Sequence, residues 1–267
     1  MTDTTAMTTT GLPAPAGDAL REALERLEAG RGLVVRVADL MGGALGRATR
    51  MGVRGLGVPG PLQSRMRGVA EAALARAYDV AILGLDLTEG DPRRAGLLRR
   101  AAVMVSGAAG GFAGMAGFLP DATVTTLSIM REIAAIAREE GEDLSSLSAR
   151  RACLEVFALR GPGEAGGDAA AGESELGYFS ARLLMQGRPM VMLVAEVAAR
   201  YGVTLSQKFA LQAVPIAGAL TGAALNAAFL AHYRDLARAH FTIRRLERLH
   251  GAAAVRDAAE EIRAGFA

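Results

Sequence analysis

The stretch from Lys208 to Arg248 reads KFALQAVPIAGALTGAALNAAFLAHYRDLARAHFTIRRLER, and the rest of the chain is organised around it. Its first half, Phe209 to Ala231, carries no charged side chain. Pro215 interrupts this half, because proline lacks the N–H that an interior helical residue donates. From Ile216 onward small residues recur, so we expect a smooth helix that neighbouring helices approach closely.

The second half of the stretch turns into a basic amphipathic helix that we expect to end at Gly251. Apolar side chains recur at helical spacing on one side, and arginines occupy the other. Such a basic face is either a solvated surface or a contact for anionic headgroups or an acidic partner. We predict a membrane- or partner-binding surface formed by Arg234, Arg238, Arg244, Arg245 and Arg248.

A second uncharged stretch, Ala101 to Pro120, is rich in glycine. It has the length of a membrane span, but its glycines weaken both its hydrophobicity and its helix propensity. It is therefore either a packing face within a membrane or a crowded crossing in a core. After it, Asp121 is expected to cap a helix that ends at Gly141, and Ser145 to cap the next helix, Leu144 to Leu159.

The composition indicates a helical protein packed through small side chains. The chain has 267 residues, 51% of them hydrophobic but only 4% aromatic, so its core is built by close helix approach. The net charge is only +2, and aromatic side chains for stacking on bases are sparse, so we expect no nucleic-acid partner. Cys153 is the only cysteine and is expected to be a buried small hydrophobe, which favours a cytoplasmic location.

No segment alternates with the period of a β-strand, so the predicted fold is all-α. We expect a multi-helix bundle whose Gly/Ala-rich central helices pack closely. Residues 1–17 lack the basic segment and the apolar segment of a signal peptide, and we expect them to form a disordered tail. Residues 18–267 predict one helical domain, with a flexible loop at 161–174.

The sequence contains no recognisable catalytic motif or metal-ligand spacing, so no catalytic residue, metal or cofactor is predicted. Three polar residues in apolar surroundings form a possible polar site: Asp121, Asn226 and His232. Asn226 lies in the middle of the smooth helix. It either forms a hydrogen bond across a helix pair or contacts a ligand.

Two separate segments resemble the EcsC protein family in the same order. The first contains Phe118-Leu119-Pro120-Asp121 and the sequence GEDL at Gly141 to Leu144. The second contains Val214-Pro215-Ile216-Ala217-Gly218-Ala219, Gly222, Asn226, Phe229, Ala237, Phe241 and Arg244-Arg245-Leu246. The resemblance covers roughly Leu62 to Leu249. It implies a helical bacterial protein with apolar Gly/Ala segments, and it carries no set of catalytic residues with it.

Three functional hypotheses follow. The leading one is a non-enzymatic helical protein at the cytoplasmic face of the membrane, with anionic lipid or a membrane protein as its partner. The second is a soluble carrier that encloses an apolar ligand or lipid between 101–136 and 209–229. The third is an enzyme with an unrecognised site that uses Asn226, Asp121 or His232.

Overall fold

The computed structural model describes residues 11–29, 65, 67–68, 74, 76–82, 115–159, 178–179, 182–183, 185, 187–198, 201 and 218–265. Five helices are defined in full: α1 (Ala14–Ala29), α6 (Met115–Glu139), α7 (Leu147–Ala158), α10 (Gly218–His250) and α11 (Ala252–Ala264). Shorter helical pieces lie within 74–82, 178–185 and 190–198. No β-strand occurs among these residues, so the predicted all-α fold is confirmed.

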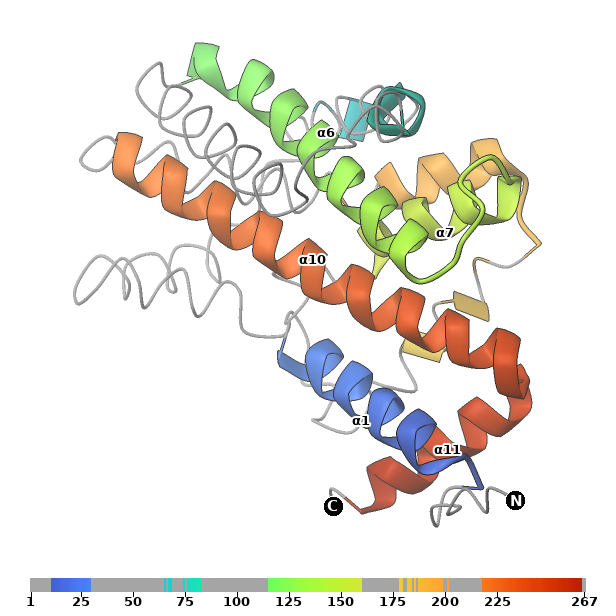
Figure 1. The fold of residues 1–267 in the computed structure, drawn as a ribbon. Helices are drawn as coiled ribbons and strands as arrows, with labels where there is room; N and C mark the ends of the chain where they lie inside the picture. The colour runs from blue at the N-terminus through green and yellow to red at the C-terminus, as the bar shows by residue number, and fades with distance from the viewer. Residues whose placement is uncertain are drawn as a thin grey trace.

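The long helix α10 is the centre of the described fold, with α1, α6, α7 and α11 packed against it (Figure 1). Helices α6 and α10 run parallel, side by side. Side-chain contacts from α6 and from the turn that follows it reach residues of α10 that lie 102 positions later, at three successive levels: Glu132–Arg234, Glu140–Thr242 and Glu142–Arg244. A constant sequence offset requires the two helices to run in the same direction. Helix α7 lies between them in the sequence.

The core combines alanines with a few aromatic rings. Phe157 of α7 packs edge-on against Tyr201, with ring centroids 4.9 Å apart, and lies 5.1 Å from the ring of Tyr233 on α10. All three rings are buried. Cys153 on α7 is also buried, as predicted, and burial raises the pKa of its thiol well above the ordinary value. This thiol therefore stays protonated and acts as a core side chain.

Glycines mark the ends of two helices, as predicted. Gly141 has φ +81° and follows the end of α6, and Gly251 has φ +90° between α10 and α11. Only glycine reaches this left-handed region without steric cost from a Cβ. The cap of α7 differs from the prediction by one residue. Ser146, not Ser145, accepts the N–H of Ala149 at 3.1 Å, while Ser145 donates to the side chain of Asp143.

Two predicted helix starts were wrong. The helix predicted to begin at Asp18 begins at Ala14. Helix α6 begins at Met115, so Asp121 lies inside the helix rather than at its N-cap. Its side chain is buried and points to α10, where an amide partner replaces the backbone donors of a cap. The predictions for 1–10, 101–114, 161–174 and 202–217, including the kink at Pro215, lie outside the described residues.

Candidate functional site

The five predicted arginines of α10 all face glutamates of α6 and of the turn that follows it. The ion pairs are Arg234–Glu132, Arg238–Glu139, Arg245–Glu140, Arg244–Glu142 and Arg248–Glu142. The arginine face is thus held in register by four carboxylates from a segment about 100 residues earlier in the chain. Much of its positive charge is neutralised within the bundle.

These arginines divide into two groups by exposure. The side chains of Arg234 and Arg244 are only 19% and 18% exposed, and each pairs with its glutamate at 2.8–2.9 Å. The side chains of Arg238, Arg245 and Arg248 are 41–42% exposed and lie at the edge of the helix pair. The first two arginines therefore join α10 to α6, and the other three remain accessible from solvent.

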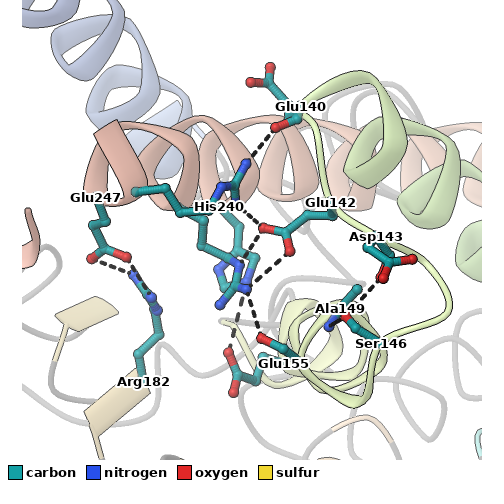
Figure 2. Close-up of polar contacts among 12 residues, drawn as sticks. Glu140, Glu142, Asp143, Ser146, Ala149, Glu155, Arg182, His240 and Glu247 are labelled. Carbon is teal, nitrogen blue, oxygen red and sulfur yellow. Dashed lines mark hydrogen bonds and ion pairs between the residues drawn. The ribbon is translucent and has the colours of Figure 1, made fainter. Parts of the chain in front are cut away.

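Glu142 is the centre of this ion-pair network (Figure 2). Its carboxylate accepts two hydrogen bonds from Arg244, at 2.9 and 3.2 Å, and another from Arg248. Burial by itself raises the pKa of Glu142. The hydrogen bonds and charges of the two arginines outweigh burial and hold the pKa below its ordinary value of 4.5. Glu142 is therefore ionised at neutral pH.

The predicted polar site is formed only in part. Asn226 Nδ2 donates to Asp121 Oδ1 at 2.7 Å, and both side chains are buried between α10 and α6. His232 is also buried, but it lies six residues further along α10, about 9 Å along the helix axis. Its ring packs edge-on against Tyr233 at 5.3 Å between centroids. The interpretation of Asn226 as a hydrogen-bonding residue across a helix pair is confirmed.

A second buried polar cluster was not predicted. It links α10, α7 and the helical piece within 178–185 through Glu247, Arg182, Tyr178, His240 and Glu155. Figure 2 shows Arg182 beside Glu247 and Glu155 near His240. Arg182 and Glu247 form a two-pronged ion pair, with both N···O distances 2.9 Å. The signal that could have indicated it is weak. His240 lies on the apolar stripe of α10, and its partners are tens of residues away.

Hydrogen bonds link Arg182, Tyr178 and His240 within this cluster. Arg182 Nη1 donates to the hydroxyl of Tyr178 at 3.3 Å, and the same hydroxyl forms a hydrogen bond with His240 Nδ1 at 3.0 Å. His240 Nε2 lies 3.8 Å from Glu155 Oε2. Burial, followed by the charges of Arg182 and Arg244, lowers the pKa of His240 well below 6.5. Burial raises the pKa of Glu155.

A histidine beside a carboxyl group is the usual material of general acid–base catalysis. Here, however, the side chains of His240 and Glu155 are 0% and 4% exposed, so solvent reaches neither. The arrangement joins buried polar side chains of α7, α10 and the helical piece within 178–185, and we assign it a structural role.

A polar pocket of about 220 Å³ lies between α1, α10 and the C-terminal end of α6. It brings together side chains from three parts of the chain that the sequence did not connect. Its lining residues are Ala19, Glu22, Ala23, Arg26, Glu140, Arg238, Thr242 and Arg245. Arginines contribute three of its charges and glutamates two, so the lining carries a net positive charge.

Three arginines link α7, α10 and residues 182, 185 and 188, and exposed apolar side chains flank these contacts in the sequence. Arg151 donates to the carbonyl oxygens of Met185 and Arg188, Arg182 pairs with Glu247, and Arg244 reaches Ser148. Five large apolar side chains within two helical turns of these contacts are 62–78% exposed, and we call them the apolar end: Leu147, Leu183, Val191, Met192 and Leu249.

The comparisons give a family and nothing more specific. The family model described as the EcsC protein family matches residues 63–246. No curated protein and no solved structure matches the chain. None of the helices in the described part combines the length and apolarity needed to cross a membrane. Within the same residues, no cluster of three potential metal ligands was found.

Proposed function

The chain belongs to the EcsC protein family, and on that premise we propose that it is a non-enzymatic protein that docks on the anionic, cytoplasmic surface of a membrane. Docking uses the apolar end, with arginines beside it. Five of the seven exposed large apolar side chains of the described residues flank the arginine contacts that link α7, α10 and residues 182, 185 and 188, and this observation carries the proposal. The other two are Val80 and Val124.

Two physical terms support binding to an anionic bilayer. Apolar side chains that enter the headgroup boundary gain about 0.8 kcal/mol for each CH₂ removed from water. Each arginine near an anionic surface adds about 1 kcal/mol. Arg248 precedes Leu249 directly, and Arg188 lies three residues before Val191; their side chains are 41% and 43% exposed. Charge and apolar surface therefore occur together.

Of the predicted arginine surface, the proposal assigns lipid contact to Arg238, Arg245 and Arg248. Arg234 and Arg244 act through the fold, because their short ion pairs hold α6 beside α10. The two groups therefore separate in experiment. Arg238→Gln weakens docking at unchanged stability, because its 3.7 Å pair with the exposed Glu139 contributes little. The same changes at Arg234 and Arg244 lower the melting temperature.

The test is cosedimentation with vesicles of phosphatidylcholine, with and without phosphatidylglycerol. The variant replaces the five residues of the apolar end with serine, and Val80→Ser/Val124→Ser is the matched control. We expect at least a tenfold loss of affinity for the anionic vesicles in the first variant, about 1.4 kcal/mol or more. The control keeps wild-type binding. Equal binding of the two variants, or no binding by the wild type, contradicts the proposal.

A further inference from the structure

We propose that the polar pocket between α1, α6 and α10 binds one phosphate group, either as inorganic phosphate or as the phosphomonoester headgroup of an anionic lipid. Only the lipid source rests on the proposed membrane docking. The lining contains three guanidinium groups, those of Arg26, Arg238 and Arg245. Arginine presents planar pairs of N–H donors that match two oxygens of a phosphate.

The three arginines reach the pocket from two helices. Arg26 is in the last turn of α1. Arg238 and Arg245 lie seven residues apart on α10, so they project from the same face two turns apart, with Thr242 between them. The pocket therefore offers one arginine from α1, two arginines from α10 and the hydroxyl group of Thr242, also from α10. Such convergence suits one compact anion.

Two of these arginines exchange their present partners at low cost. Arg26 pairs with Glu22 one turn earlier on the same helix, and both side chains are substantially exposed. Such an exposed pair within one helix contributes little to stability. Arg238 lies 3.7 Å from Glu139, whose side chain is 59% exposed, so this pair is also weak. A phosphate that replaces these carboxylates loses little and gains charge-assisted hydrogen bonds.

The third arginine is held in place. Arg245 Nε lies 2.7 Å from Glu140 Oε2, and the side chain of Glu140 is only 18% exposed. Thr242 donates to the same carboxylate over 3.3 Å, near the upper limit for a hydrogen bond. Its hydroxyl can turn to an incoming oxygen instead. The pocket thus has one fixed cation, two exchangeable cations and an adaptable hydroxyl group.

Charge and size select the class of ligand. Three arginines and two glutamates leave one positive charge, which favours an anion over a metal cation. The volume of about 220 Å³ is below the roughly 300–1,000 Å³ of sites for larger organic ligands. A single phosphate with its water molecules fits, and a nucleotide does not. Leu249 follows Arg245 by one turn on the same helix face, so this residue of the apolar end lies about 6 Å along α10 from an arginine of the pocket.

The first arm of the test is calorimetric titration of the full chain with inorganic phosphate, at constant ionic strength set by chloride. Arg26→Gln/Arg238→Gln changes the two exchangeable cations and leaves the Arg245–Glu140 pair intact. Arg76→Gln/Arg256→Gln removes the same charge at exposed helix positions that do not line the pocket. We expect at least tenfold weaker phosphate binding in the pocket variant alone. Absence of binding by the wild type, or an equal loss in both variants, overturns the proposal.

The second arm distinguishes the two sources of phosphate. Vesicles of phosphatidylcholine contain either phosphatidic acid, a phosphomonoester, or phosphatidylglycerol, a phosphodiester, at equal surface charge. A preference for phosphatidic acid that the pocket variant loses identifies the lipid source. Phosphate binding without such a preference identifies the free anion. The serine variant of the apolar end separates the two proposals, because it loses vesicle docking and keeps phosphate binding.

Discussion

Asn226 donates its side-chain N–H to Asp121 across the interface of α10 and α6, from a position 105 residues later in the chain. The ion pairs further along the same interface have nearly the same offset, 102 residues at Glu132–Arg234 and Glu142–Arg244. One buried polar contact near the start of the interface and a charged ladder towards its end therefore fix the register of two parallel helices. A shift of α10 by one turn would separate all of these pairs at once.

The first prediction concerns this buried hydrogen bond. Asn226→Ala removes the donor and leaves a void between the helices, so we expect the free energy of unfolding to fall by about 1–3 kcal/mol. Asp121→Asn is the matched variant, because it keeps an acceptor oxygen at the same place, and it should cost less. Urea unfolding followed by circular dichroism measures both. If Asp121→Asn lowers the free energy of unfolding as much as Asn226→Ala does, the contact does not depend on this donor and acceptor.

The second prediction concerns the ion pair of Arg182 and Glu247, whose side chains are 6% and 16% exposed. Arg182→Leu leaves the glutamate buried without its two-pronged partner and should destabilise the fold by about 3–5 kcal/mol. The control is Arg188→Leu, which removes an exposed arginine 3.9 Å from Glu196. It should cost less than about 1 kcal/mol. Thermal unfolding compares the two. Similar losses would mean that the buried pair contributes no more than a surface pair.

The sequence was informative where a residue's environment depends on its own helix. The apolar stripe of α10 and the burial of Cys153 followed from helical periodicity, and the structure confirms them. For Asn226 the sequence left two interpretations, and the structure shows the hydrogen bond across a helix pair. The arginine face was recognised, but its partners were not. Charges spaced for a lipid surface look the same in sequence as charges spaced for carboxylates 102 residues away, and only the parallel packing of α6 and α10 brings those carboxylates into contact.

The buried cluster around His240 was missed for a related reason. Tyr178 lies 62 residues before His240, and Arg182 lies 65 residues before Glu247, with no local spacing that connects them. The pocket likewise combines Arg26 of α1 with residues of α10. Such sites are products of tertiary packing, whereas helix periodicity reports only which face of each helix is buried.

The third prediction concerns acid stability through Glu142. Its pKa is lowered in the folded state, so the unfolded state binds more protons near and below pH 4.5. The stabilisation by Arg244 and Arg248 is thus fully present above pH 4.5 and is lost as pH falls through the folded pKa. Glu142→Gln should cost about 2 kcal/mol at neutral pH and progressively less in acid. Glu139→Gln, at an exposed position, is the control and should change little at any pH.

The fourth prediction concerns His240, whose pKa lies well below 6.5 in the folded state, so the unfolded state takes up the proton first as pH falls. Stability from the neutral imidazole is present above pH 6.5 and is lost below it, at up to about 1.4 kcal/mol per pH unit. Glu155 has a raised pKa and acts in the opposite direction, so the free energy of unfolding must be compared between variants at each pH.

His240→Asn should be less stable at neutral pH but should lose less stability on acidification, because it has no imidazole to protonate. His250→Asn, at the end of α10, should follow the wild type. Parallel curves for wild type and His240→Asn between pH 7 and pH 5 would show that the buried imidazole is not the group that titrates.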